Sequence, residues 1–255
     1  METSLHIEIA EEMMSVAKVT RFTFAALILY IRQHQPKRER QRARLAWRVG
    51  AAAGTGKVRR KAESMEKEAF IELVEANPVV AAIKDDDGLK RCLESDIDVV
   101  FVLYGDVISI RDIVHRLKKG NKTVLVHVDL ISGLAPKEVS VDFIRKYTEA
   151  DGIITTRRNL TEYAKSLGMN TVLRYFMIDS LVLENIKKQS KAEIQPDIIE
   201  ILPAILVPDF IERIRKICKA PLMASGLVTS KQETLHALNA GAIAVSTTNQ
   251  TIWFS

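Results

Sequence analysis

The stretch from Pro196 to Trp253 constrains the fold of this 255-residue chain more than any other. It contains three short apolar runs, each long enough for a buried strand, separated by two segments with apolar residues at helical spacing. The three runs are Ile198–Leu202, Pro221–Ala224 and Ala242–Ser246. Because parallel strands must be joined by a crossover, usually a helix, this alternation predicts a parallel sheet covered by helices on both faces.

The two segments between these strands carry the signals of amphipathic helices. In the first, the residues at the spacing of one buried face are Phe210, Ile211, Ile214, Ile217 and Cys218. The second opens with a capping box from Ser230 to Glu233, in which two side chains satisfy backbone donors at the helix start. It ends before Gly241, and glycine readily adopts the left-handed conformation that stops a helix.

The same alternation extends back to residue 79. Five further apolar runs are Val79–Ile83, Val99–Tyr104, Thr123–Val128, Gly152–Thr155 and Thr171–Phe176. Eight strand–helix units predict an α/β fold, a small TIM-type (β/α)8 barrel. The strands fall within about 170 residues, below the roughly 200 usual for this fold, so the helices must be short and one of them can be missing. A doubly wound open sheet is the structural alternative.

Basic residues are concentrated in the first quarter of the chain. Residues 1–64 contain 13 Lys and Arg against 6 Asp and Glu, although the net charge of the whole chain is only +5. We therefore divide the chain into a basic N-terminal extension, residues 1–64, and a barrel domain, residues 65–255. We interpret the extension as a disordered segment or as the product of a start codon assigned too far upstream. An RNA-binding arm and a solvated helix are the alternatives.

Cysteine usage and apolar runs indicate the compartment. Cys92 and Cys218 are the only cysteines, too few for a disulfide framework or a metal-ligand cluster. The longest apolar run, Phe22–Ile31, is too short to span a bilayer, and it follows acidic residues, unlike a signal peptide. We expect a cytoplasmic protein with no membrane partner and no metal.

Charged side chains stand at the ends of several predicted strands. They are Lys84, Asp129, Arg174 and Glu200. A lone charge that faced the helix layer would be buried unpaired, at a cost of several kcal/mol. At the C-terminal mouth of a barrel it can meet water, a ligand or an opposite charge, so we predict that the four residues ring one cavity and bind a small polyol phosphate. Internal salt bridges are the alternative. For His127, a packed or hydrogen-bonded role is favoured over a catalytic one.

The last two predicted strands run into small hydroxyl residues. These ends are Ser225-Gly226 and Ser246-Thr247. Small residues let backbone N–H groups approach a ligand, and a phosphate site after strands seven and eight recurs in (β/α)8 barrels. We predict phosphate binding at these four residues, with ordinary loop chemistry as the alternative.

Seven segments of the chain carry a family resemblance. They are NPVVAAIKD, LVHVDLISGL, IITTRRN, LRYFMIDSLVLEN, PDIIEILPA, APLMASGLV and NAGAIAVSTTNQTIW. Together, from Asn77 to about Trp253, they closely resemble the glycerol uptake operon antiterminator regulatory family. The resemblance implies a small TIM-type barrel that binds glycerol 3-phosphate as its effector and acts on an mRNA leader to prevent early termination. It implies regulation, with no catalytic residues and no cofactor.

The resemblance also assigns roles to positions. The Ser225-Gly226 and Ser246-Thr247 ends match the family's phosphate-binding loops, and the four charged strand-end residues match its polar positions. The family tends to have glycine where this chain has Ala204 and Ser225, which bears on effector specificity. An isomerase, aldolase or synthase of a small phosphorylated metabolite is the alternative, because a fold does not determine function.

Two predicted helices carry basic residues that RNA phosphates would attract. The candidate RNA-binding residues are Arg111, Arg116, Lys118 and Lys119. A second basic set is Arg213, Arg215, Lys216 and Lys219. An ordinary solvated helix face is the alternative for both.

Overall fold

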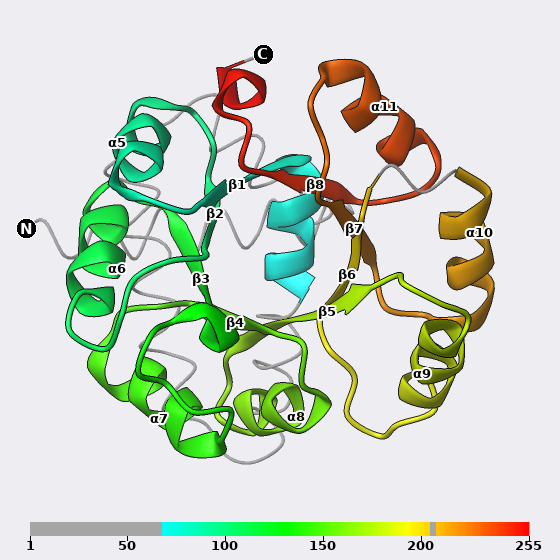
Figure 1. The fold of residues 1–255 in the computed structure, drawn as a ribbon, viewed down its shortest axis with the longest axis horizontal. Coiled ribbons are helices and arrows are strands. Elements are labelled where there is room, and N and C mark those ends of the chain that lie inside the picture. Colours follow the sequence, from blue (N-terminus) through cyan, green and yellow to red (C-terminus); the bar gives the residue numbers. More distant parts are fainter. Residues whose placement is uncertain (1–67, 205–207, 255) are drawn as a thin grey trace, which may run out of the picture. The chain divides into compact units, whose positions relative to one another are not determined.

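Eight parallel strands close into a barrel. The computed structural model describes residues 68–204 and 208–254 (Figure 1). The strands follow one another in sequence order, and the first pairs with the last. They are β1 (Val79–Ile83), β2 (Val99–Val102), β3 (Thr123–His127), β4 (Gly152–Thr155), β5 (Asn170–Phe176), β6 (Ile198–Leu202), β7 (Leu222–Ser225) and β8 (Ala244–Thr247). Closure confirms the predicted (β/α)8 barrel and excludes the open sheet.

Short helices surround the barrel (Figure 1). They are α5 (Asp86–Glu94), α6 (Ile110–Lys119), α7 (Glu138–Tyr147), α8 (Arg158–Ser166), α9 (Leu181–Gln189), α10 (Pro208–Ile217) and α11 (Lys231–Asn239). Residues 68–76, before β1, are also helical. After β8 the described chain forms only a 3₁₀ helix, η2 (Gln250–Phe254), where an eighth α-helix would follow. The short helices and the missing one match the expectation from the length of the strand region. The predicted extension, residues 1–64, lies outside the described residues.

Helix α11 begins and ends as its sequence predicts. The Ser230 hydroxyl accepts a hydrogen bond from the Glu233 N–H at 3.2 Å, and the Glu233 carboxylate accepts one from the Ser230 N–H at 3.1 Å. Hydrogen bonds from the backbone and hydroxyl of Thr229 and from Ser230 lower the pKa of Glu233. Gly241 has φ +107°, and a Cβ there would clash with the Arg215 guanidinium. The capping box and the glycine stop are therefore both confirmed.

The outward-facing side chains of the strands pack against the helices in two apolar clusters. In one, Ile83 of β1 lies with Leu89 of α5. In the other, Ile201 of β6 lies with Ile214 of α10. All four side chains are buried, so each half of the barrel is fixed to its helix layer by apolar contact.

The inward-facing side chains form layers whose polarity changes along the barrel axis. If the paired residues are followed from β1 through β8 and back to β1, the path returns to β1 eight residues before its starting point. Because of this shear, side chains at the same height along the barrel axis come from alternate strands. From the N-terminal end upward, three successive layers are Val80, Leu125, Val172 and Met223; then Phe101, Ile154, Glu200 and Ser246; then Ala82, His127, Arg174 and Ser225. The interior is therefore apolar below and polar toward the C-terminal ends of the strands.

Two lysine–aspartate pairs brace the N-terminal ends of the strands in the same way. Lys118 Nζ lies 2.5 Å from Asp151 Oδ2, and this carboxylate also accepts the Val124 N–H at 2.9 Å. Lys165 Nζ lies 2.5 Å from Asp197 Oδ1, and this carboxylate accepts the Thr171 N–H at 2.9 Å. Each pair joins the end of a helix to the starts of two adjacent strands.

Candidate binding site at the mouth of the barrel

A buried ion pair crosses the interior near the mouth. Arg174 Nε donates to Glu200 Oε2 at 2.6 Å, and Ser246 Oγ donates to Glu200 Oε1 at 2.8 Å. Arg174 is 7% exposed and Glu200 is 0% exposed. The two residues are register partners on β5 and β6, which places the charges side by side. Both oxygens of Glu200 are thus engaged by protein donors.

His127 lies beside this pair in the uppermost polar layer. It is 2% exposed, and its Nδ1 atom has no hydrogen-bond partner within the described residues. Burial, and next the nearby Arg174 cation, lower the pKa of His127 to about 4, so the imidazole is neutral at pH 7. Of the two roles that the sequence favoured for His127, packed or hydrogen-bonded, the structure shows a packed side chain whose Nδ1 atom has no hydrogen bond among the described residues. The position of His127 two residues before Asp129 indicates that the side chain faces into the barrel, but not that Nδ1 lacks a hydrogen bond.

Asp129 is held by the loop that follows β4. It lies in the 3₁₀ helix η1 (Val128–Leu130) after β3. Its Oδ2 atom accepts the Thr156 N–H at 2.7 Å and the Thr155 hydroxyl at 3.0 Å. The Arg157 guanidinium lies 3.7 Å away from Oδ1. The carboxylate is therefore oriented by β4 and its loop, apart from the Arg174–Glu200 pair.

The four predicted polyol-binding residues do not form one cluster of the same kind. Arg174 and Glu200 are buried and bonded to each other, Asp129 is bonded to the loop after β4, and Lys84 is exposed at the end of β1. Lys84 has no ion pair in the described part of the chain. Arg174 and Glu200 thus form a buried pair, whereas Asp129 and Lys84 lie in separate surroundings. The polyol-binding role of the four residues stays a prediction.

The Ser225-Gly226 end retains free hydrogen-bonding groups. Ser225 is 2% exposed, and its hydroxyl has no partner among the described residues. Gly226 and Leu227 have φ values of +77° and +58°, and within residues 68–204 and 208–254 their backbone N–H groups make no hydrogen bond. The loop is supported from behind by the Ala204 N–H, which donates to the Ser225 carbonyl at 2.6 Å. A bend with free amides is a common binding site for anions.

The Ser246-Thr247 end is adjacent but is used by the protein itself. Ser225 and Ser246 are register partners on β7 and β8, so the two predicted phosphate-binding ends are neighbours. The Ser246 hydroxyl is bonded to Glu200. The Thr247 hydroxyl donates to the Val228 carbonyl at 3.2 Å and accepts the Asn249 N–H at 3.0 Å. Of the predicted phosphate-binding hydroxyls, only that of Ser225 lacks a protein partner in the described structure.

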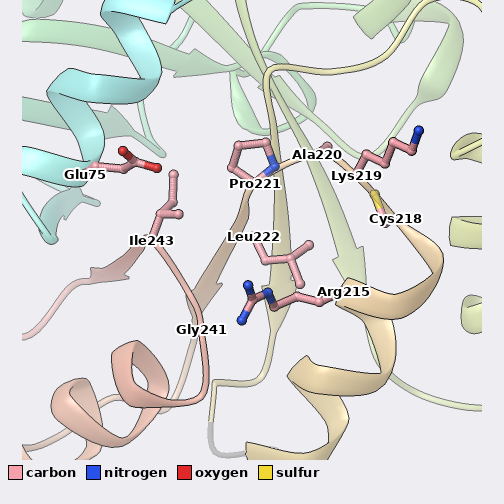
Figure 2. Close-up of a pocket in the computed structure, with 9 residues that line it drawn as sticks. All are labelled: Glu75, Arg215, Cys218, Lys219, Ala220, Pro221, Leu222, Gly241 and Ile243. Carbon is pink, nitrogen blue, oxygen red and sulfur yellow. The ribbon is translucent and has the colours of Figure 1, made fainter. Parts of the chain in front are cut away.

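A pocket of about 410 Å³ opens at the other end of the barrel (Figure 2). It is lined by Glu75, Arg215, Cys218, Lys219, Ala220, Pro221, Leu222, Gly241 and Ile243. These residues include the chain just before β7 and β8, and parallel strands place that end far from Ser225 and Ser246. The pocket is therefore separate from the mouth and contains none of the predicted phosphate- or polyol-binding residues.

Two of the predicted RNA-binding residues on α6 are engaged in ion pairs. Lys118 binds Asp151, and the Arg116 guanidinium lies 3.7 Å from Asp86 on α5. Arg111 and Lys119 are exposed and have no ion pair among the described residues. The four side chains do not form one continuous free basic face, and their role in RNA binding stays a prediction.

The fold and the polar mouth define a TIM-type barrel protein with its candidate site at the C-terminal ends of the strands, where such barrels carry their sites. No group of His, Cys, Asp and Glu residues in the described structure is arranged to hold a metal ion. Residues 79–253 match the family model of the glycerol-3-phosphate responsive antiterminators. The chain belongs to this family.

Relatives of known structure have the same fold. The glycerol uptake operon antiterminator regulatory protein from Listeria monocytogenes is 32% identical, with a TM-score of 0.64 over 69% of this chain and 94% of that chain. A glycerol uptake operon antiterminator-related protein from Thermotoga maritima is also 32% identical, with a TM-score of 0.61 over 69% of this chain and 98% of that chain.

A further relative was found by sequence. The uncharacterized protein YgcP of Escherichia coli K12 is 39% identical over 184 residues, 72% of this chain and 95% of YgcP.

More distant barrels share the fold alone. Orotidine 5'-phosphate decarboxylase from Pyrococcus horikoshii is 18% identical, with a TM-score of 0.54 over 69% of this chain and 90% of that chain. This likeness carries no statement about activity. In the part of the chain that the structure describes, every helix is too short or too polar to cross a membrane.

Proposed function

We propose that this protein is a cytoplasmic transcription antiterminator that binds glycerol 3-phosphate in the mouth of its barrel and, when so occupied, binds a leader mRNA of genes for glycerol uptake and metabolism. The observation that carries the proposal is the family membership of residues 79–253, which include the whole barrel. The family is named for a response to glycerol 3-phosphate, and its members of known structure are described as regulators of the glycerol uptake operon. Regulation therefore takes precedence over the enzyme alternative.

The end of β7 supports the phosphate half of this proposal. The Ser225 hydroxyl and the amides of Gly226 and Leu227, which make no hydrogen bond to the described residues, are donors, and a phosphate offers only acceptors at its charged oxygens. Ser246 and Thr247 border the same place from β8. Arg174, which lies in the same layer on the neighbouring odd-numbered strand β5, supplies positive charge beside it.

Calorimetry with glycerol 3-phosphate, and with glycerol as a ligand that lacks phosphate, tests the effector. We expect glycerol 3-phosphate to bind and to raise the melting temperature, because a ligand that binds only the native state adds about 2.7 kcal/mol at a hundredfold excess over Kd. Glycerol should give no shift at the same concentration. Absence of binding by glycerol 3-phosphate would refute the effector assignment.

Fluorescence anisotropy with a labelled leader RNA tests the regulator. The RNA should bind more tightly when glycerol 3-phosphate is present, and linkage requires the RNA to tighten effector binding by the same factor. Arg111→Glu with Lys119→Glu should weaken RNA binding and flatten its salt dependence, because fewer counterions are released. The matched variant is Arg213→Glu with Lys216→Glu on α10. A larger loss in that variant would move the RNA surface to α10.

The same samples test the enzyme alternative. Incubation of the protein with glycerol 3-phosphate, followed by phosphorus NMR, should return the ester unchanged. If the ester is converted and the RNA affinity does not depend on the effector, the protein is an isomerase, aldolase or synthase and not a regulator.

A further inference from the structure

Two buried polar atoms belong to the upper layer of the barrel, and neither has a hydrogen-bond partner among the described residues. They are His127 Nδ1 and Ser225 Oγ, each on a side chain that is 2% exposed. Leaving a buried polar group unpaired destabilises the folded state, and native proteins retain few such groups. Both atoms lie at the level where the interior opens toward the mouth. Their placement therefore points to an outside partner for each.

The carboxylates near His127 are already bonded to other protein groups. The nearest carboxylate oxygen recorded for Nδ1 is Asp129 Oδ2 at 3.9 Å, beyond hydrogen-bond distance. That carboxylate already accepts bonds from Thr155 and Thr156. Glu200 is likewise bonded to Arg174 and Ser246. Asp129 and Glu200 are therefore both engaged by donors other than His127.

The two unpaired atoms stand on opposite walls. In the closed order of eight strands, β3 and β7 are four strands apart, and the register puts His127 and Ser225 in the same layer. A ligand whose phosphate lies at the Ser225-Gly226 end thus extends its carbon chain across the layer toward β3. The group that arrives there is the polyol end.

We propose that His127 is a specificity-determining residue that hydrogen-bonds a hydroxyl group of the polyol phosphate through Nδ1, while Ser225 serves the phosphate end. This assignment rests on the proposed function. It gives the polyol contact to a histidine in place of Arg174 and Glu200, whose groups are already bonded to each other. A neutral imidazole suits a hydroxyl, because each of its nitrogens either donates or accepts one hydrogen bond. Burial and the Arg174 cation, which lower the pKa of His127 to about 4, keep it neutral.

The test compares glycerol 3-phosphate with propyl phosphate, which has the same carbon chain but no hydroxyl, against wild type and His127→Leu. We expect the variant to bind glycerol 3-phosphate about 10- to 100-fold more weakly, the loss of one hydrogen bond to a buried group. Its affinity for propyl phosphate should stay within about twofold, because the phosphate contacts remain. His236→Leu, at an exposed position on α11, should match wild type with both ligands.

Three results would overturn the assignment. They are an equal loss of both ligands, unchanged affinity for glycerol 3-phosphate, and no preference of wild type for glycerol 3-phosphate over propyl phosphate. Should His127→Leu fail to fold, His127→Met makes the same comparison with a flexible side chain. His127→Asn should restore most of the affinity, because its amide carries a donor and an acceptor near the position of Nδ1. Failure of wild type to bind glycerol 3-phosphate at all would instead refute the proposed function.

Discussion

Arg174 and Glu200 are joined twice, as register partners on adjacent strands and as an ion pair of 2.6 Å inside the barrel. The backbone register alone places the two charged side chains next to each other. A buried pair pays a large desolvation cost, and its net value to stability is small or negative compared with apolar residues of the same volume. We infer that the pair is retained to set the charge and shape of the mouth.

Arg174→Met should lower the free energy of unfolding by about 3–5 kcal/mol, because it leaves the Glu200 carboxylate buried without its cation. Arg174→Met with Glu200→Met should recover most of this loss, because no charge is then left unpaired. Urea unfolding measures both. Arg158→Ala, which breaks the exposed pair with Glu162, should cost less than about 1 kcal/mol. A double variant as unstable as the single one would contradict the prediction.

Stability should fall as the pH drops from about 6.5 to about 4, because His127 is protonated in the unfolded chain below its ordinary pKa of 6.5 but in the folded chain only near pH 4. In this window the unfolded state binds more protons, and the loss attributable to His127 reaches about 3 kcal/mol. Urea unfolding of wild type and His127→Gln at pH 7, 5.5 and 4 measures it. The difference between the two proteins, which removes the contribution of the carboxylates, should shift in favour of the variant as pH falls.

Gly226→Asp should abolish binding of glycerol 3-phosphate, because it places a carboxylate where the phosphate is expected. Gly226→Ala is the control, since both variants must adopt the positive φ of +77°. That conformation costs a residue other than glycine about 1–2 kcal/mol. Thermal unfolding should therefore show similar destabilisation in both, while calorimetry shows binding only in the alanine variant. Equal binding by both would place the phosphate elsewhere.

Ser230→Ala should cost about 1 kcal/mol, because it removes the acceptor for the Glu233 N–H at the start of α11. Chemical unfolding measures the change. Ser166→Ala, at the exposed end of α8, removes a hydroxyl that is not an N-cap and should cost less. A similar cost for both would show that the capping box contributes no more than an ordinary surface hydroxyl.

The barrel was predictable because its signal repeats. Eight apolar runs recur with helical segments between them, and only a few folds with a parallel sheet are compatible with this pattern. Burial confirms the expected helix faces, including Ile211 and Ile214 on α10 and Cys218 directly after it. The short strand region also indicated that one helix could be missing, but only the structure shows that it is the one after β8.

The binding site was less predictable, because sequence shows which residues face inward but not which of them bind each other. Alternation correctly placed Arg174 and Glu200 inside the barrel, yet only the register shows that they are adjacent and bonded. Lys118 appeared as one of several basic residues, and its partner Asp151 is distant in the chain. His127 lacked any local sign that Nδ1 would be left unpaired, since that depends on hydrogen bonds made by Asp129 to another strand.

The 3₁₀ helix that follows β8 also gives the barrel an internal optical probe. The indole N–H of Trp253 is bonded to the carbonyl of Thr247, at the strand end beside the predicted phosphate loop. The chain has one other tryptophan, Trp47, and its replacement by phenylalanine leaves a single emitter. We expect a ligand that binds at the end of β8 to change the environment of that indole, so that its fluorescence reports binding in real time and without a label.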